Sequence, residues 1–409
     1  MYLQLPGSQE VATCGQYERE TLATGGAVGR FRYGRRYRTR TDAVPLDPVG
    51  LPLSDEVFET ARLKGVHGAL RDAVPDAWGR LVIDRDSRSS DLDEFDYLLR
   101  GPEDRAGALA FGLGKDPPPP VSPSNSILQL RELREAAGRI EAGENPGDFP
   151  AHLRALVAPG TSLGGARPKT VVEDADGLWV AKFPSRGDRW NNALVEGAML
   201  ALAKRSGIRI PPARLERLGD EDVLLLKRFD REKVGEGYLR HRVLSGLTVL
   251  AAEEEATDRG RWSYLLLADE LQRRSERSGE DKEELFRRMV FNALISNNDD
   301  HPRNHSLVSP GGDWHLAPAY DLTPQPSTSQ QRDLALTAGF RGRAAQRENL
   351  LSGAPRFGLS DAKARAVIDD VKAVVAETWE AEVYRLGGTR KDCDSIRTAF
   401  VYEGFEHTA

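Results

Sequence analysis

The sequence predicts an α+β protein in which a strand-rich first part precedes a mainly helical second part. Three observations lead to this prediction. Short apolar runs punctuated by glycine, which are typical of strands, recur through residues 1–232. Apolar residues recur at helical spacing over long stretches of residues 233–409. A proline-rich stretch at 117–123 separates an N-terminal part, 1–116, from the rest of the chain. The whole chain of 409 residues is long enough for two or three domains.

Composition and charge indicate an ordinary globular protein of the cytoplasm. Charged residues make up 29% of the chain and hydrophobic residues 39%, as in typical water-soluble domains. The net charge of −6 gives no overall signature of nucleic-acid binding. The two cysteines, Cys14 and Cys393, are far apart, so a disulfide framework is not expected. We recognise no signal peptide and no apolar run of membrane-spanning length, so we expect no membrane contact.

The N-terminal part opens with segments that favour strands. In the run 29–40, arginines alternate with aromatic residues. Such a run can bind nucleic acid, but its period of two is also typical of a half-exposed antiparallel strand with the rings facing inward, which we favour. Further on, Asp76 follows a proline and precedes Trp78, which predicts the cap of a helix. The stretch 117–123 is expected to be a semi-rigid polyproline spacer.

A glycine-rich stretch at 160–169 follows the spacer and a short helix. Glycine lets backbone N–H groups approach phosphate oxygens, and Ser162 and Lys169 would add a hydroxyl donor and a charge. A plain hairpin turn is the alternative. The next apolar runs, 170–173 and 178–184, predict a β-hairpin closed by an Asp-Ala-Asp-Gly loop.

Lys182 lies at the end of the second of these strands. A lysine at a strand end is commonly just solvated, but a strand lysine after a glycine-rich hairpin is where nucleotide kinases keep the residue that contacts the phosphates. Glu196, 14 residues further on in a helical segment, is placed to pair with Lys182. The run 223–231 then predicts a buried strand that leaves into a charged turn, where a hinge between two lobes would fall.

The polar loop 296–306 is the element that the preceding motifs lead to. It follows an amphipathic helix over 285–295. Asp299 and Asn304 are five residues apart, and a second carboxylate, Asp321, lies further along. Phosphoryl transfer requires such a set, because one carboxylate orients or deprotonates the attacking hydroxyl while an Asn and a second carboxylate hold magnesium.

Two alternatives compete for this loop. Clusters of Asp, Asn, His and Pro are common in ordinary turns, where their side chains cap helices and turns. His301 and His305 also have the helical spacing of two zinc ligands, but Pro302 between them argues against a helix there.

The order of the motifs is more specific than any one of them. Glycine-rich hairpin, strand lysine, helix glutamate, hinge strand, helical half, Asp-x4-Asn loop and second aspartate follow one another as in protein kinases. We therefore predict a two-lobed protein-kinase-like fold. Its expected parts are an N-terminal β-rich subdomain at 1–116, a linker at 117–123, a lobe with the glycine-rich loop at 124–232 and a mainly helical C-terminal lobe at 233–409.

With these residues in place, the chain resembles the HipA-type serine/threonine kinases, the toxin half of bacterial type II toxin–antitoxin pairs. The resemblance rests on the segments 72–80, 162–169, 180–184, 228–231, 298–304 and 320–322. Each segment is weak alone, but together they are specific and span most of the chain.

The resemblance implies a role for each matching residue. Asp299 would be the catalytic base, and Asn304 and Asp321 would hold Mg²⁺. Glu196 would support Lys182 through an ion pair. The residues expected to contact ATP are Ser162, Lys182, Lys227, Phe229, His301, Asn304 and Asp321.

The resemblance also implies regulation and partners. Ser162 falls where such kinases phosphorylate themselves, and a phosphate there would be repelled by the ATP phosphates, so the glycine-rich loop would leave the site and silence the enzyme. Family members phosphorylate translation components, notably aminoacyl-tRNA synthetases. A helix-turn-helix antitoxin of the HipB type neutralises them and binds operator DNA, so contact with DNA would be indirect. Asp300 and Pro302 depart from the family pattern and could alter the fit of the substrate.

Two other functions remain open. A small-molecule or lipid kinase of similar build would share the Asp-x-His-x-x-Asn loop, although the toxin-like N-terminal part argues against it. A catalytically silent module that sequesters a partner is the second alternative. The intact set of Lys182, Asp299, Asn304 and Asp321 argues against that module.

Overall fold

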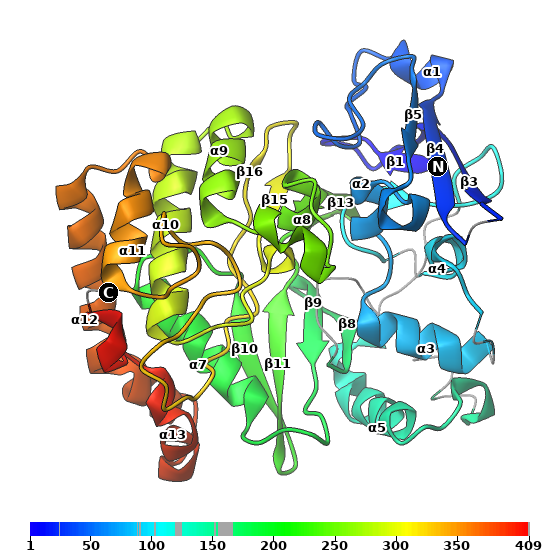
Figure 1. The fold of residues 1–409 in the computed structure, drawn as a ribbon. Helices are drawn as coiled ribbons and strands as arrows, with labels where there is room; N and C mark the ends of the chain where they lie inside the picture. Colours follow the sequence, from blue (N-terminus) through cyan, green and yellow to red (C-terminus); the bar gives the residue numbers. More distant parts are fainter. Residues whose placement is uncertain are drawn as a thin grey trace. The chain divides into compact units, whose positions relative to one another are not determined.

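The computed structural model describes residues 1–409 apart from 24, 88, 90, 102–103, 119–124, 151–152, 154–166 and 408–409. The chain forms two units, each assembled from separate segments. The first unit consists of Met1–Arg186, Lys227–Glu253 and Val308–Gly312, and the second of Gly187–Leu226, Glu254–Leu307 and Asp313–Ala409. Most of the described strands lie before residue 232, where helices accompany them, and the C-terminal region is mainly helical (Figure 1), which confirms the predicted α+β class.

Two small antiparallel sheets belong to the N-terminal region of the first unit. One sheet contains β2 (Val11–Thr13), β1 (Tyr2–Gln4) and β6 (Leu109–Ala110) in that order, and the other contains β3 (Gly15–Thr21), β4 (Ala27–Tyr33) and β5 (Val57–Thr60). Their inner faces share a core of aromatic and aliphatic side chains.

The run in which arginines alternate with aromatic residues is a strand only in its first part. Along β4, Phe31 and Tyr33 are buried while the arginines between and before them are more exposed, which confirms the predicted half-exposed strand. The strand prediction is wrong for the end of the run, because the chain turns there into α1 (Arg35–Arg38). Tyr37 favours this turn, since its ring stacks on Tyr33 and its hydroxyl donates to the carbonyl of Val44 at 2.7 Å.

Helices and further strands complete the first unit. The helices are α2 (Gly68–Asp72), α3 (Ala77–Ser87), α4 (Glu94–Arg100), α5 (Leu130–Glu141) and α8 (Gly246–Val249). The strands are β7 (Asn125–Ser126), β8 (Lys169–Asp174), β9 (Gly177–Lys182), β12 (Arg231–Val234), β13 (Gly237–Arg240) and β14 (Arg242–Ser245). The β8–β9 hairpin confirms the predicted one, and Gly177 at φ 124° supplies a conformation in its turn that other residues rarely adopt.

The second unit is mainly helical. Its helices are α7 (Asn192–Arg205), α9 (Tyr264–Arg274), α10 (Ser278–Leu294), α11 (Arg347–Gly353), α12 (Asp361–Arg385) and α13 (Arg390–Ile396). The strands that lie in it or at its borders are β10 (Ala213–Leu218), β11 (Glu221–Lys227), β15 (Ser306–Ser309) and β16 (His315–Leu316).

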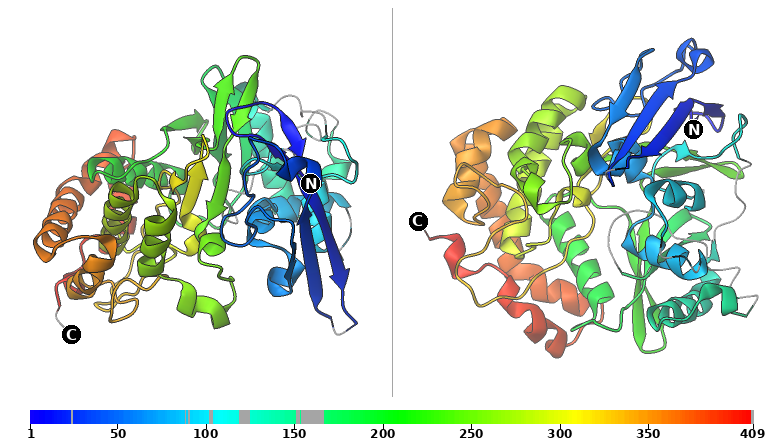
Figure 2. Two further views of the ribbon diagram at one scale, coloured as in Figure 1. Left: turned by 90° about the horizontal axis from the view of Figure 1, so that it is seen from above. Right: turned by 45° about the vertical axis from the view of Figure 1, so that its right-hand side comes forward.

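The predicted apolar helix faces form the core of the second unit. The face of α10 that includes Leu285, Met289 and Val290 is fully buried, because α10 packs against both α9 and α12. Helix α12 packs in turn against α7, and Figure 2 shows these helices bundled side by side. Each fully buried aliphatic or aromatic side chain contributes roughly 1.5–3 kcal/mol. Among the helices that the structure describes, none is long and apolar enough to cross a membrane.

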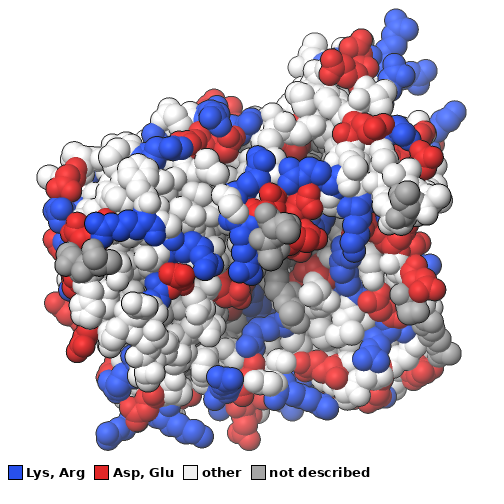
Figure 3. Space-filling model, viewed as in Figure 1, with Lys and Arg blue, Asp and Glu red and all other residues white. Residues whose placement is uncertain are grey.

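Acidic and basic side chains are interspersed over the face of the molecule shown in Figure 3. On that face, no large field of one sign stands out. This distribution agrees with the moderate net charge of −6.

Candidate active site

The loop that carries Asp299 begins where α10 ends, in the second unit. Ser296 has φ +53°, a left-handed conformation that turns the chain out of the helix, and its hydroxyl donates to the carbonyl of Ala399 at 2.6 Å. Further on, Pro302 starts the short 3₁₀ turn Pro302–Asn304, where the missing N–H of proline is tolerated. Pro302 therefore shapes the loop locally and removes none of its polar side chains.

Asp299 and Asp321 share one electrostatic environment. Asp299 is exposed, yet the surrounding protein removes enough water to raise its pKa, the charges of Asp321 and Asp300 raise it further, and His301 opposes the shift. Asp321 is half-buried and has φ +61°, which an aspartate tolerates better than most residues. A raised pKa makes the Asp299 carboxylate a better proton acceptor.

Asn304 presents an amide oxygen to which none of the described residues donates. Its Nδ2 donates to the backbone carbonyl of Asp299 at 3.2 Å, which fixes the orientation of the amide. Its Oδ1 is buried and, in the part of the chain that the structure describes, makes no hydrogen bond. A neutral oxygen held in this way suits a hard cation, so Asn304 and Asp321 fit the predicted magnesium ligands.

Asp300 faces the interior, although it follows Asp299 directly. It is 1% exposed, and its carboxylate accepts hydrogen bonds from the Tyr264 hydroxyl and from Nε2 of His305 at 2.9 Å. Burial and the charge of Asp300 raise the pKa of Tyr264 well above its usual value, so the hydroxyl remains a donor. Asp300 therefore anchors the loop to the interior through Tyr264 and His305. Because its side chain is buried, it would affect the fit of a substrate only by changing the loop backbone.

The two histidines of the loop do not sit on one helix. His305 is buried, with Nε2 on Asp300 and its ring edge-on to Tyr264 at 5.3 Å between centroids. His301, half-buried, precedes the 3₁₀ turn and has a buried Nδ1 without a partner among the described residues. Across the residues that the structure describes, no three His, Cys, Asp or Glu side chains are placed to hold a metal ion. The helical spacing of His301 and His305, on which the zinc alternative rested, is not formed, because a 3₁₀ turn lies between them.

Tyr320 ties the Asp321 segment to the loop. Its hydroxyl donates to the carbonyl of Arg303 at 2.8 Å and accepts from Oγ of Ser306 at 2.7 Å. The guanidinium of Arg303 pairs in turn with Glu254. The sequence contained a signal for this contact, since Tyr320 precedes Asp321 directly, but its role as a link was not predicted.

The predicted strand lysine and helix glutamate lie in different units. Lys182 is half-buried and ends β9 in the first unit. Glu196 is 5% exposed, on α7 in the second unit. Their ion pair therefore stays a prediction.

Lys169 does not have the position that the glycine-rich stretch suggested. We expected its charge to face phosphates, but its Nζ pairs with Oδ2 of Asp76 at 2.5 Å, and the two side chains are only 2% and 4% exposed. The other oxygen of Asp76 accepts from the N–H of Gly79 at 2.9 Å, which confirms the predicted helix cap. Ser162 lies outside the described residues, so its role stays a prediction.

Lys227 and Phe229 stand on either side of a buried arginine, in the first unit. Both are half-buried, whereas Arg228 is 2% exposed and its N–H donates to the carbonyl of Leu178 at 2.9 Å. This bond joins the end of the predicted hinge strand to β9. The predicted contacts of Lys227, Phe229 and His301 with ATP stay predictions.

Comparisons with known proteins match both parts of the chain. The model of the HipA-like C-terminal domain matches residues 161–379, and that of the HipA N-terminal domain matches residues 14–112. Two relatives from Sinorhizobium fredii, both provisionally named kinases, are similar in sequence. Y4dM is 29% identical over 249 residues, which are 56% of this chain and 58% of Y4dM. Y4mE is 26% identical over 336 residues, which are 73% of this chain and 72% of Y4mE.

One solved structure matches nearly the whole chain. It is the toxin–antitoxin system HipA of Shewanella oneidensis MR-1, solved with HipB and its operator DNA. The match covers 98% of this chain and 95% of that one, with a TM-score of 0.69 and 17% sequence identity. The two chains therefore share a fold.

Proposed function

This chain belongs to the HipA family and has its two-lobed, kinase-like fold, and from that premise we propose that it is an ATP- and Mg²⁺-dependent serine/threonine kinase. One observation carries the proposal. The exposed Asp299 carboxylate has a raised pKa, lies within the electrostatic reach of Asp321, and belongs to the loop in which Asn304 holds a buried oxygen without a donor among the described residues. A proton acceptor and two oxygen ligands are what phosphoryl transfer asks of a protein.

Each of these side chains has a distinct task in the proposed reaction. Asp299 accepts the proton of the attacking hydroxyl, or positions that hydroxyl, as the phosphoryl group is transferred. Asn304 Oδ1 and Asp321 hold Mg²⁺, which neutralises the charge of the nucleotide phosphates when it is bound. Lys182 contacts the phosphates from the end of β9.

Transfer of phosphate from ATP tests this function directly. The purified protein is incubated with γ-labelled ATP, with and without magnesium, and the label on protein is measured. We expect incorporation that requires magnesium and is lost in Asp299→Asn. The control Asp394→Asn changes an exposed aspartate of α13 and should match the parent. No transfer by the parent, or full transfer by Asp299→Asn, would contradict the proposal.

Nucleotide binding tests the assignment of Lys182 and the metal ligands. Calorimetry with a non-hydrolysable ATP analogue should show binding that weakens in Lys182→Ala and in the absence of magnesium, because both remove positive charge from the phosphates. Unchanged affinity in either case would contradict the site as described.

Self-modification at Ser162 is part of the proposal. A phosphate there adds about −1.5 to −2 charges and would be repelled by bound ATP, so the modified enzyme would be silent. Intact-mass spectrometry after incubation with ATP should show one added phosphate in the parent and none in Ser162→Ala or Asp299→Asn. Equal incorporation in Ser162→Ala would place the modification elsewhere.

Membership of the family suggests a partner and a substrate for the proposed kinase. The Shewanella protein was solved with HipB and operator DNA, and we expect a small helix-turn-helix antitoxin of that type to bind this chain, which would reach DNA only through it. Co-expression with the neighbouring gene's product should give one peak in size exclusion, and two separate peaks at micromolar concentration would contradict this pairing. A protein of translation, such as an aminoacyl-tRNA synthetase, is the proposed substrate, which phosphosite mapping in the host would identify.

A further inference from the structure

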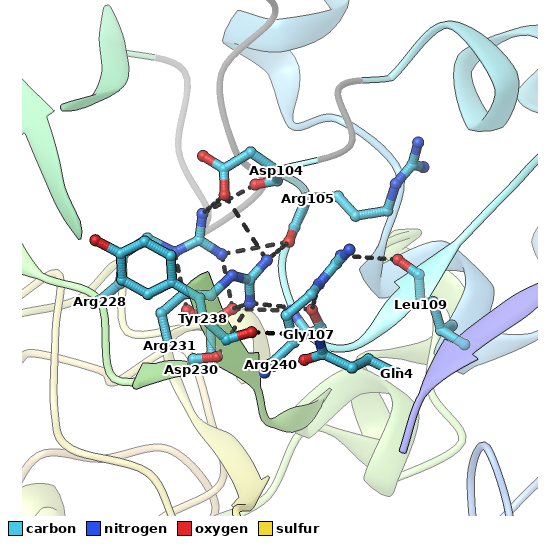
Figure 4. Close-up of polar contacts among 10 residues, drawn as sticks. All are labelled: Gln4, Asp104, Arg105, Gly107, Leu109, Arg228, Asp230, Arg231, Tyr238 and Arg240. Atoms are coloured by element: carbon cyan, nitrogen blue, oxygen red, sulfur yellow. Dashed lines mark hydrogen bonds and ion pairs between the residues drawn. The ribbon is translucent and has the colours of Figure 1, made fainter. Parts of the chain in front are cut away.

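A buried cluster of charged side chains adjoins the segment that carries Lys227 and Phe229. It joins two stretches of the first unit, 104–109 and 228–240 (Figure 4). The side chains of Arg228 and Asp230 are 0% exposed. Charges in a protein interior are tolerated only where they are paired and hydrogen-bonded, so the contacts within this cluster determine how the two stretches sit.

Asp230 is the centre of the cluster. One of its oxygens accepts from Nε of Arg228 at 2.9 Å. The other accepts from Nη2 of Arg228 at 2.7 Å, from Nη1 of Arg231 at 2.7 Å and from the N–H of Gly107 at 2.9 Å. Burial alone would raise the pKa of Asp230, but the charges of Arg228 and Arg231 hold it well below its usual value. The carboxylate is therefore ionised and filled with donors.

The arginines hold the other stretch by its backbone. Arg228 donates to the carbonyl of Asp104 at 2.9 Å and to its carboxylate at 2.6 Å. Arg231 donates to the carbonyls of Arg105 and Gly107 at 2.6 and 3.0 Å. Arg240 donates to the carbonyls of Gly107 and Leu109 at 3.1 and 2.9 Å. We call the stretch 104–109 the strap.

The strap follows this path because of one glycine. Gly107 has φ +75°, where other residues are strained, and it both donates to Asp230 and accepts from two arginines. The cluster also depends on the charge of Asp230. Burial lowers the pKa of Arg231 to about 9 and that of Arg240 to about 10, so these two arginines have too little negative charge nearby, whereas Asp104 and Asp230 raise the pKa of Arg228 above its usual value. A neutral residue at position 230 would leave Arg231 and Arg240 with even less negative charge nearby.

The resemblance to the HipA-type kinases implies that the strand from Leu226 to Phe229 would line the adenine pocket, and exposure alternates along this segment and into Asp230. Lys227 and Phe229 are half-buried, and Arg228 and Asp230 are buried. The strap holds Arg228 and Asp230, and it thereby fixes the backbone between them. We propose that Asp230 is a positioning residue of the nucleotide site, and that the strap, from the N-terminal part of the chain, sets the shape of the adenine-binding segment. This inference rests on the proposed function, because it deepens the assignment of Lys227 and Phe229.

Asp230→Asn tests the proposal, with Asp104→Asn as a milder variant. Asp104 is 31% exposed, so its variant should fold even if Asp230→Asn does not. Asp42→Asn is the matched control, because it removes the same charge from an exposed ion pair of the first unit. Three quantities are measured for each protein: the dissociation constant of an ATP analogue, the KM for ATP, and kcat of phosphate transfer at saturating ATP. Circular dichroism reports the folded fraction.

A displaced adenine segment weakens nucleotide binding without removing the catalytic groups. We expect the dissociation constant and the KM for ATP to rise at least about fivefold in Asp230→Asn and less in Asp104→Asn, with kcat near that of the parent. Loss of folded protein alone would lower kcat and leave KM unchanged, and that result would overturn the proposal. Parental KM in folded Asp104→Asn and Asp230→Asn would overturn it too. If the parent itself binds no nucleotide, the proposed function fails instead.

Discussion

Asp230 in the first unit and Asp300 in the second are both buried carboxylates, but they differ in how far the polar atoms around them have hydrogen-bond partners. Asp230 takes its four hydrogen bonds from two guanidinium groups and a backbone N–H. Asp300 takes its bonds from a tyrosine hydroxyl and a histidine ring. Close to it in the chain, Nδ1 of His301, Oδ1 of Asn304 and Nδ1 of His305 are buried without a partner in the described part of the chain.

This difference indicates a structural role for the surroundings of Asp230 and a functional role for the loop around Asp300. A buried polar atom without a partner costs about 1–3 kcal/mol, which proteins tolerate mainly where a ligand or the reaction uses that atom. The Asp230 carboxylate, whose two oxygens accept four hydrogen bonds, therefore has the character of a structural support. The loop around Asp300 is held by Tyr264 and His305, and it carries the groups assigned to the proposed reaction, the exposed Asp299 carboxylate and the buried Oδ1 of Asn304.

The neighbours Asp299 and Asp300 should give the largest contrast. Asp299→Asn should lower the rate of phosphate transfer by about 10²–10⁴-fold with little change in nucleotide affinity, because a general base acts in the transition state. Asp300→Asn should lower the rate less and should also lower the melting temperature, because it weakens two buried hydrogen bonds. Parallel kinetics and thermal melts check this. The contrast fails if the two variants have the same profile.

The two buried carboxylates should also differ in their contributions to stability. Asp230→Asn breaks buried ion pairs and should lower the free energy of unfolding by about 3–5 kcal/mol. Asp300→Asn replaces a carboxylate whose partners are a tyrosine and a histidine, and should cost about 1–3 kcal/mol. Urea unfolding of both variants, followed by fluorescence and circular dichroism, measures the difference. A larger loss for Asp300→Asn would reverse the comparison.

A smaller effect should appear with pH in the first unit. Burial of His67 lowers its pKa to about 4, against a weaker opposing hydrogen bond with the backbone of Phe58. The unfolded chain takes up this proton near pH 6.5 and the folded chain only near pH 4, so stability is complete above pH 6.5 and falls as the pH drops toward 4, by about 1.4 kcal/mol per pH unit.

His67→Gln should flatten this dependence between pH 6.5 and 5. His407→Gln, which changes an exposed histidine near the C-terminus, serves as the control and should leave the dependence unchanged. Unfolding curves at three pH values provide the measurement. An equally steep dependence in His67→Gln would show that other groups cause it.

The smallest effect is expected for the partly exposed ion pair that Arg303 of the loop forms with Glu254. Arg303 and Glu254 form an ion pair with side chains 21% and 45% exposed. Solvent screens such a pair, so Glu254→Gln should lower stability by less than about 1 kcal/mol and leave the transfer rate nearly unchanged. A rate loss comparable to that of Asp300→Asn would mean that the Arg303–Glu254 ion pair, and not the buried contacts of Asp300, holds the loop in place.

Local patterns in the sequence were sufficient where the physical cause is local. The Asp-Ala-Asp-Gly loop predicted the β8–β9 hairpin, and apolar spacing from Leu285 onward predicted the buried face of α10. Asp299, Asn304 and Asp321 were selected from the chemistry of a spaced set. The structure then brings Asp299 and Asp321 within electrostatic reach of each other.

Contacts between distant residues could not be read in this way. Lys169 was expected near phosphates because its glycine-rich neighbourhood suggested it, but its partner Asp76 lies 93 residues away. Asp104 and Arg228 are 124 residues apart. Asp299 and Asp300 have identical side chains, and only the path of the folded loop turns one outward and the other inward. Such choices depend on the whole fold, since no local rule distinguishes these residues.

The strap also determines how this protein would respond to a break in its backbone after Asp116. The proline-rich stretch that begins at residue 117 suggests a clean border, but a break after Asp116 would put the strap and its arginines on separate polypeptides. The longer fragment alone would be left with Arg228, Arg231 and Arg240 lacking the carbonyls that hold them. Produced together, the fragments should reassemble, because the contacts that join them are noncovalent. The border is therefore a place to split the protein into two complementary fragments.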